Sequence, residues 1–412
     1  MILTIYKIRL LYHYNIYDDN IIQFIIRENI FILRDIFNIY KNKLNVKYLS
    51  ANCNALDLLL EPEYIKKISI DRLCNVNSKD LSKTLFTLYY SGIYDFKVFH
   101  RNKINLSRNY YGIDFIKEYP RCINYYHLAN NKMGKDLLLD IIPKLNKQQL
   151  ERHDNILYEY LFTNENMMEY VANNIEMIRT LDIDPRIIKD RLSNNINCAL
   201  FWKITQVDFN TIINNISLIK LLDNYIDLSI LLCNKNIDNI STELNFNIID
   251  FYNKFMDSNN IPEVYKLSNY DDNHFWNKMS RECKSFDFLV YYKDKLNYKL
   301  LCCNEYAIPL LVEYTNRDYF NWNTLSLNIN AIPILTNNIH KINWKNLSLN
   351  INAIDILSNN TDKIDYENLA LNVNAIELLE DYITTNKKCS KIFWNNLSTN
   401  PNIFVILNIS IY

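Results

Sequence analysis

The side chains best suited to acid–base chemistry or metal binding are scattered along this 412-residue sequence. Its six histidines form neither an H-x-x-x-H nor an H-E-x-x-H pattern, so no two are spaced to hold a metal ion from one helix face. Acidic residues that could serve as general acids or bases lie in polar stretches that we predict to be solvated turns. These stretches are His153-Asp154, Asp271-Asp272-Asn273-His274, Asp18-Asp19 and Glu61 beside Pro62. The sequence therefore predicts no catalytic residue and no metal ligand.

Nine cysteines offer thiol chemistry, but their spacing is irregular and no C-x-x-C pattern occurs. An odd number of scattered cysteines predicts neither a zinc site nor a disulfide framework, and favours free buried thiols in a reducing compartment. The cysteines are Cys53, Cys74, Cys122, Cys198, Cys233, Cys283, Cys302, Cys303 and Cys389.

Glycine-rich phosphate-binding loops are also excluded, because the three glycines (Gly92, Gly112 and Gly134) are far apart. A loop that cradles a phosphate needs clustered glycines, so neither a P-loop nor a dinucleotide fingerprint is present. The serines lack the G-x-S-x-G context of a hydrolase nucleophile. We therefore expect no cofactor.

The charge balance constrains the partners. The formal net charge is −1, with 22% charged and 49% hydrophobic residues. Such a balance supplies a core and argues against nonspecific nucleic-acid binding, which requires a basic excess. The N-terminal stretch is interrupted by Lys7, Arg9 and His13 and has no signal-peptide pattern. No uninterrupted apolar run is long enough to cross a bilayer, so we expect no membrane partner.

A motif of about 22 residues recurs in the sequence, and its elements must position every side chain named above. Trp322-Asn-Thr-Leu-Ser-Leu-Asn-Ile-Asn-Ala-Ile is followed at the same spacing by copies that begin at Trp344 and Tyr366, and a fourth begins at Trp394. If the aromatic residue is position zero, Leu is at three, a small residue at four, Asn at six and often eight, and a small residue at nine. Apolar residues follow at ten, twelve and thirteen.

Weaker copies extend the motif toward the N-terminus, with longer spacings that predict looped insertions. The regular copies cover 298–404, and the degenerate or longer ones cover 46–297. The weaker copies place position zero at Val46, Lys103, Tyr125, Tyr158, Phe209, Trp276 and Tyr298, with a further copy over Leu192–Cys198 and poor copies near Ile70, Leu228 and Tyr252.

Each copy is predicted to form two short helices, and stacked copies would share one core. The residue before position zero (Asn321, Asn343 or Asp365) can cap the first helix. Asn at position six is expected to end it in the left-handed conformation, and Asn at position eight to cap the next. Small residues at position nine suggest that neighbouring helices come closest there. The predicted fold is an all-α solenoid of two-helix repeats of about 22 residues.

The alternative fold is a leucine-rich-repeat-type solenoid, because positions zero to ten also read L-x-x-L-x-L-x-x-N-x-L. That fold buries position five in a strand. Here position five includes Arg108, Asn130 and Arg281, which favours exposure and the helical reading. Residues 1–45 lack the motif and are expected to form an N-terminal helical cap on the repeat region 46–412.

The L-S-x-N-x-N-A-I run after Trp or Tyr resembles the short repeats of uncharacterised proteins from giant DNA viruses (mimivirus-like). The abundance of Asn, Ile, Lys and Tyr, whose codons are AT-rich, is consistent with such a genome. The resemblance implies a viral protein of the host cytoplasm or the virion. It brings no established activity.

The function predicted from the sequence is a non-enzymatic repeat scaffold that binds a host or viral protein partner, through a face that the sequence does not identify. The alternative is an RNA-binding helical-repeat protein, in which polar side chains on successive units read bases. The Trp and Tyr series could stack bases, but its position in the motif favours a core role. An enzyme would need clustered polar residues outside the motif, for which only 225–275 is irregular enough.

Overall fold

The computed structural model describes residues 31–142, 159–175, 185–205, 228–257, 272–313, 317–386 and 388–406. The described chain is mostly helical, which confirms the all-α class. Its strands in these ranges are β1 (Phe31–Leu33) and β2 (Phe404–Ile406). They pair antiparallel, with Ile32 opposite Val405.

Within the described ranges, most motif copies, named here after their residue at position zero, contribute a first helix that begins at or shortly before that position. These first helices are α4 (Val46–Leu49), α6 (Ile70–Leu73), α9 (Lys103–Arg108), α11 (Tyr125–Ala129), α16 (Pro185–Asn194), α20 (Leu228–Leu231), α24 (Asp272–Glu282), α26 (Tyr298–Leu301), α28 (Trp322–Leu327), α30 (Trp344–Leu347), α32 (Tyr366–Leu369) and α34 (Lys391–Thr399).

A second helix follows in most copies after a short connection. These second helices are α5 (Leu56–Leu59), α7 (Leu81–Tyr90), α10 (Ile113–Glu118), α12 (Lys135–Ile141), α14 (Met168–Asn173), α17 (Cys198–Ile204), α21 (Ile237–Glu243), α25 (Phe286–Tyr291), α27 (Ile308–Glu313), α29 (Ile332–Thr336), α31 (Ile354–Ser358) and α33 (Ile376–Thr385). Further α-helices are α3 (Asp35–Ile39), α8 (Phe96–Arg101) and α22 (Ile248–Asp257).

Short 3₁₀ helices lie between or before these elements. They are η1 (Lys41–Lys43), η2 (Ile65–Lys67), η3 (Tyr110–Gly112), η4 (Pro120–Cys122), η5 (Lys132–Gly134), η7 (Glu165–Met167), η8 (Lys293–Lys295), η9 (Glu305–Ala307), η10 (Arg317–Tyr319), η11 (Ile339–Lys341), η12 (Thr361–Lys363) and η13 (Pro401–Ile403).

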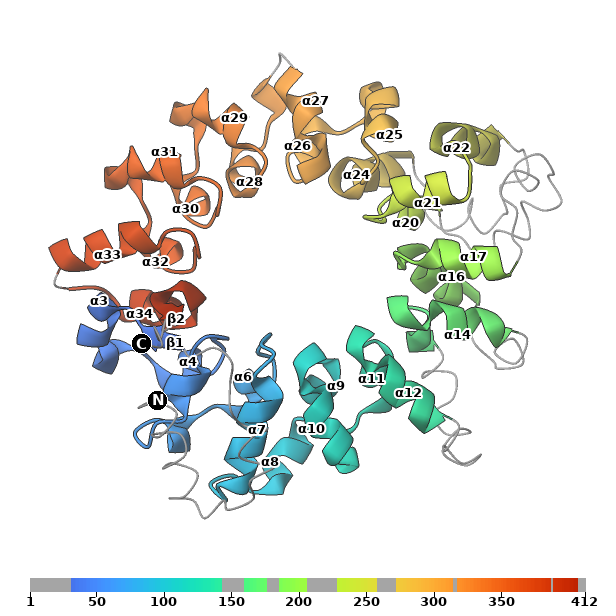
Figure 1. Ribbon diagram of the computed structural model, residues 1–412. Coiled ribbons are helices and arrows are strands. Elements are labelled where there is room, and N and C mark those ends of the chain that lie inside the picture. Colours follow the sequence, from blue (N-terminus) through green and yellow to red (C-terminus); the bar gives the residue numbers. More distant parts are fainter. Residues whose placement is uncertain are drawn as a thin grey trace, which may run out of the picture. The chain divides into compact units, whose positions relative to one another are not determined.

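The chain forms two compact units. Unit 1 contains residues 1–134 and 344–412, and unit 2 contains residues 135–343. Within unit 1, the first helix α9 lies beside the first helix α11 and beside the second helix α10 of its own repeat (Figure 1). The predicted boundary at residue 45 stays a prediction, because residues 1–30 lie outside the described ranges.

The residue before position zero caps the first helix, as the sequence predicts. The side-chain oxygen of Asn321 accepts a hydrogen bond from the backbone N–H of Thr324 at 3.3 Å. The Asp365 carboxylate accepts one from Asn368 N–H at 2.9 Å. Each bond satisfies a backbone donor that the helix leaves without a partner in its first turn.

The expected left-handed asparagine at position six is wrong. Asn328 has φ −72° and ψ 116°, which is extended backbone, and Asn304 is similar at φ −90° and ψ 114°. Among the described non-glycine residues, a positive φ occurs at Asn245. The position-six side chain instead accepts from the N–H of position eight, as Asn304 does from Tyr306 at 2.9 Å. It therefore caps the turn that starts the second half of the repeat.

The same asparagine joins one repeat to the preceding one. Asn372 Nδ2 donates to the carbonyls of Ser348 at 3.1 Å and Asn350 at 3.0 Å, which are positions four and six of the Trp344 repeat. In unit 2, Asn234 donates in the same way to Ser193 and Asn195 at 2.9 and 3.0 Å. The buried amide therefore satisfies two buried carbonyls of a neighbour and one N–H of its own repeat.

This contact resolves the register of the irregular region. The Leu228 repeat is a poor match by sequence. It nevertheless packs as the next repeat after the one that contains Asn195, because its Asn234 bonds directly to Asn195. The N–H of Lys284, in the Trp276 repeat, donates to Leu232 O at 3.0 Å. The copy expected near Tyr252 therefore does not intervene between these repeats, since Tyr252 lies within α22. The copy expected at Phe209 lies outside the described residues.

Position nine is crowded because neighbouring helices come close there, as the sequence suggests. A Cβ built on Gly112 would lie 2.8 Å from the carbonyl oxygen of Leu106, and one on Gly134 would lie 2.8 Å from the side chain of Leu128. Both neighbours are position three of the same repeat. The close approach is therefore between the two halves of one repeat, and not between adjacent repeats.

The leucine-rich-repeat alternative is not supported by the described residues. Positions zero to three of the Trp344 repeat form α30, where that fold would place a strand. Leu327 and Leu371 at position five are exposed, whereas Leu325 and Leu369 at position three are fully buried. Position three thus supplies the core. In the Trp394 repeat, residues 404–406 form β2 in place of an expected second helix.

Candidate binding surface

The residues considered for acid–base chemistry do not form a site in the described part of the chain. Glu61 is paired with Lys41, with 2.7 Å between its carboxylate and the lysine Nζ. His274 is exposed on α24. Asp18, Asp19, His153, Asp154 and Asp271 lie outside the described residues. Within the described ranges, no group of three or more His, Cys, Asp or Glu side chains could hold a metal ion.

The cysteines are free thiols where they are described. Burial raises the pKa of the Cys74, Cys198 and Cys283 thiols far above the ordinary value, and raises the pKa of Cys302 to about 11. A thiol that keeps its proton at neutral pH is a poor nucleophile. Cys303, in contrast, is exposed beside Cys302.

The side chains that recur in the motif make hydrogen bonds between repeats. Besides Asn at position six, Asn at position eight donates to the carbonyl of position seven in the preceding repeat. Asn374 does so to Ile351 at 2.9 Å and Asn402 to Val373. At position four, the Ser348 hydroxyl donates to Trp344 O at 2.8 Å and accepts from Asp365 N–H at 3.1 Å. In the described repeats, contacts within and between repeats thus explain the L-S-x-N-x-N run.

The variable part of each repeat is the connection between its two halves. We call positions five, seven and eight the loop row. Consecutive connections must lie side by side within a unit, because the asparagine bonds join their backbones directly. The loop row is therefore a continuous strip whose side chains are free to differ from repeat to repeat.

In unit 1 the loop row carries exposed apolar side chains at two places. Ile351 and Leu371, on adjacent repeats, are 37% and 42% exposed. Tyr110 and Met133, also on adjacent repeats, are 41% and 61% exposed. Isolated exposed apolar residues are common, but neighbours on a shared strip are typical of a contact surface.

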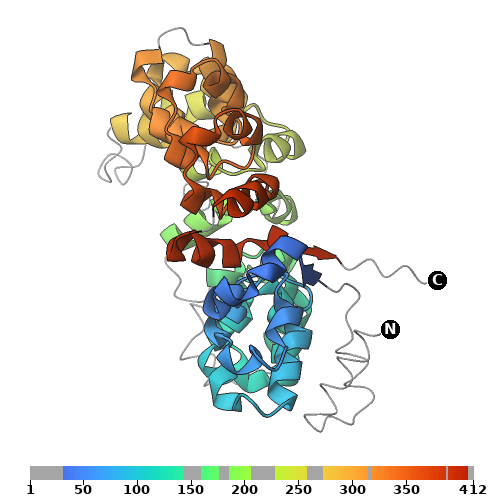
Figure 2. The same ribbon diagram turned by 90° about the vertical axis from the view of Figure 1, so that its left-hand side faces the viewer.

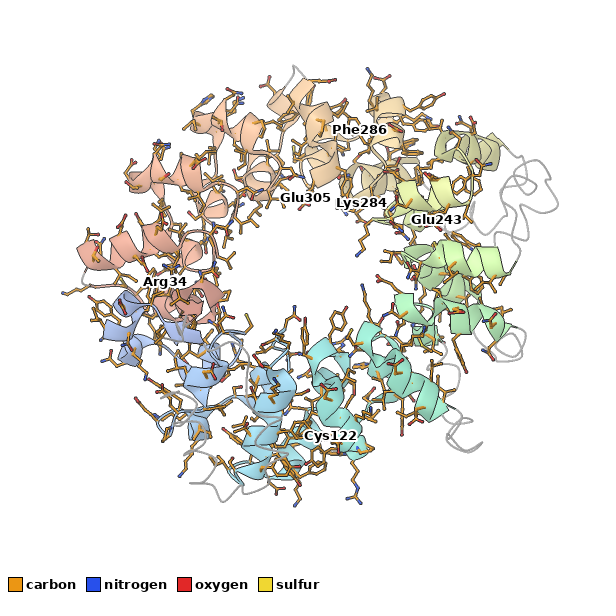
Figure 3. The ribbon with its side chains drawn as sticks, in the orientation of Figure 1. Arg34, Cys122, Glu243, Lys284, Phe286 and Glu305 are labelled. Atoms are coloured by element: carbon orange, nitrogen blue, oxygen red, sulfur yellow. The ribbon has the colours of Figure 1, made fainter. Side chains whose placement is uncertain are left out.

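In unit 2 the loop row combines aromatic and charged side chains. The Nζ of Lys284 lies 4.8 Å from the ring centroid of Tyr306, a cation–π contact between two position-eight residues. Lys284 and Glu305 lie on one side of this part of the ribbon, and Phe286 of α25 lies on the other (Figure 3). The loop row of unit 2 therefore carries both signs of charge, with Glu305 in the repeat that follows Lys284.

The aromatic residues at position zero are less buried than the sequence suggests. Trp276 and Trp394 are buried, but Trp322 and Trp344 are only half-buried. Their rings are covered by lysines three residues before the next position zero: Lys341 lies 5.1 Å from the Trp322 centroid and Lys363 lies 4.9 Å from that of Trp344. A ring face that already carries an ammonium group is not free to stack a base.

Sequence reasoning missed the apolar character of the loop row. A usable signal was present: Tyr306 and Met133 stand at position eight, where asparagine is common. They replace a residue that bonds to the neighbouring repeat with one that cannot form that bond. Such a replacement is expected where a side chain has another role.

No described helix has the length and apolar character that spanning a bilayer demands. Comparison with protein-family models, curated proteins and solved structures finds no match to this chain. The class that its own residues define is a mostly helical chain in which a recurring asparagine motif joins successive helix pairs.

Proposed function

We propose that the protein is a helical solenoid that acts as a non-enzymatic scaffold and binds a protein partner through the loop row. The resemblance of its L-S-x-N-x-N-A-I repeats to those of giant-virus proteins favours a viral protein with a host or viral partner. Recurrent asparagine bonds between successive repeats support the solenoid, since each repeat buries its faces only against its neighbours.

The observation that carries the proposal is that some motif positions make structural contacts while others are exposed. Positions three, four and six, and the asparagines at position eight, serve the core or the contact between repeats, whereas the other loop-row residues include the exposed Ile351, Leu371, Tyr110 and Met133. Apolar and aromatic side chains on a continuous strip are suited to a protein surface, because burying them on binding is favourable.

The RNA-binding alternative requires a basic strip with free aromatic faces. The loop row of unit 2 contains Glu305 next to Lys284, and the rings of Trp322 and Trp344 are covered by lysines. These contacts favour a protein partner over RNA.

The test is affinity capture from infected and uninfected host-cell lysates, with and without nuclease. We expect a partner that resists nuclease and is lost from the double variant Ile351→Asp/Leu371→Asp. Ile392→Asp is the matched control, because Ile392 is also exposed and apolar but lies on α34, outside the loop row. Capture that disappears with nuclease would instead support the RNA-binding alternative.

A further inference from the structure

The Val46 repeat and the Trp394 repeat, the first and last copies of the motif in the sequence, are bonded to each other inside unit 1. Asn52 Nδ2 donates to the carbonyls of Ser398 at 3.1 Å and Asn400 at 2.9 Å. Asn54 Nδ2 donates to Pro401 O at 3.0 Å. The blue helix α4 accordingly lies beside the red helix α34 (Figure 1).

These bonds repeat those between neighbours in sequence, position by position. The pair of carbonyls that Asn52 contacts corresponds to the pair that Asn372 contacts in the Trp344 repeat. Asn45 N–H donates to the Ser398 hydroxyl at 2.9 Å, just as Asp365 N–H donates to Ser348. The Val46 repeat therefore occupies the place that a next repeat would take after Trp394.

Contacts outside the motif reinforce this junction. Strand β1 pairs with β2, and Figure 2 shows the two side by side. The Arg34 N–H donates to Ile403 O at 2.9 Å, and its Nε donates to Asn402 O at 3.0 Å. Its guanidinium lies 3.5 Å from the Glu380 carboxylate, with about a third of each side chain exposed.

The two surfaces of the junction are different, so the interface is heterologous: a surface on residues 31–60 meets another on residues 380–406. Elsewhere in the array, neighbouring repeats are tethered by a short connection. Here the two partners are separated by more than three hundred residues of sequence. Strands of three residues and an ion pair that is about one-third exposed add only a little to the asparagine bonds of the junction.

We propose that this junction is a reversible clasp, and that its alternative partner is the same junction on a second copy of the chain. Two open chains could exchange their clasps and form every bond of the closed state between chains. Such an exchange costs little, because it creates no new interface. At low concentration the closed chain is favoured, since its two surfaces are held close to each other.

A charge-reversal pair tests the clasp. Arg34→Glu and Glu380→Arg each place like charges across the closed clasp. An exchanged dimer of one variant with the other would place opposite charges at both clasps. The two variants, carrying different tags, are mixed in mild urea, returned to buffer, and analysed by size-exclusion chromatography with light scattering.

We expect the dimer fraction in the mixture to be about three- to tenfold higher than in either variant alone. This range follows from the free energies of exposed ion pairs. The chain that carries both substitutions should return to monomer. A matched control is the mixture of Lys41→Glu and Glu61→Lys. That ion pair, 2.7 Å apart, lies within one side of the clasp, so exchange cannot repair it.

An equal dimer fraction in the mixture and in each single variant would overturn the proposal. A similar excess in the Lys41/Glu61 control would do the same, because it would show association by another route. The wild-type monomer fraction before urea serves as the reference for each measurement. The outcome does not depend on whether the loop row binds a partner.

Discussion

At the scale of single residues, the position-six asparagine makes more contacts than a capping residue needs. Asn372 is 1% exposed, donates to two carbonyls of the preceding repeat, and accepts from Asn374 N–H at 3.0 Å. Aspartate could accept but not donate, and serine could not reach three partners. The amide is the side chain that meets all three demands.

We therefore expect Asn372→Ala to destabilise the protein by about 2 kcal/mol, because it leaves buried backbone groups without partners. Asn359→Ala is the control: its exposed side chain bonds only within its own helix region, to Asp355 O at 2.8 Å, and it should cost less than about 0.5 kcal/mol. Urea unfolding followed by circular dichroism gives the comparison. Equal costs would show that the contact between repeats contributes nothing.

A second prediction at this scale concerns alkaline pH. Burial raises the pKa of Cys302 from 9.0 to about 11. Since the unfolded thiol ionises first, the contribution to stability is present below pH 9 and is lost as pH rises to 11. Cys302→Ser should reduce this alkaline loss, and it keeps the hydrogen-bonding role that serine has at position four in other repeats. Unfolding free energies measured from pH 8 to 10.5 test it; identical slopes would contradict it.

At the scale of helices, position four depends on how the next repeat begins. After the Tyr298 and Trp322 repeats, the next first helix starts at position zero, and the N–H of its capping residue lies outside that helix and bonds to a thiol or hydroxyl at position four. Ser326 and Cys302 accept from Asn343 and Asn321 in this way, at 3.0 and 3.3 Å.

Where the next helix starts earlier, position four is apolar. Phe162, Leu232 and Ala370 precede the longer helices α16, α24 and α34. The residue before position zero is then inside the helix. Phe393 N–H, for example, bonds to the Ser390 hydroxyl at 3.0 Å. No donor is left for position four to satisfy.

This rule predicts opposite results for two substitutions. Ser348→Ala should cost about 1 kcal/mol, because Asp365 N–H loses its acceptor, whereas Ser348→Cys should cost less. Ala370→Ser should bring no comparable gain, since Phe393 N–H already has a partner. Thermal unfolding midpoints of the three variants decide it. A gain for Ala370→Ser equal to the loss for Ser348→Ala would refute the rule.

The helical class and the helix caps at Asn321 and Asp365 were predictable, because they depend on local hydrogen bonds between residues a few positions apart. The backbone of Asn328 was not predictable in the same way. A lone asparagine is compatible with either a left-handed or an extended conformation, and the choice depends on carbonyls of another repeat. The bond from Asn52 to Ser398 was invisible for the same reason: nothing in the sequence separates a neighbour along the chain from one 346 residues away.

At the scale of the whole molecule, the sequence carries a net charge of −1, and the loop row of unit 2 contains both lysine and glutamate. Nonspecific binding of RNA depends on releasing counterions from a basic surface. We expect no better than about 10⁻⁴ M affinity for mixed-sequence single-stranded RNA at physiological salt. Fluorescence anisotropy measures this, and micromolar binding that weakens steeply with salt would contradict it.

The residue at position four also has a use in reading related sequences. Insertions hide a repeat because they change the spacing, but position four records the kind of connection that follows. Serine or cysteine at position four indicates a connection that ends in a capping residue. Phenylalanine or leucine at position four indicates that the first helix of the next repeat begins before its position zero. A chain whose copies are spaced too unevenly for a period to be visible could be divided into units from this one residue type.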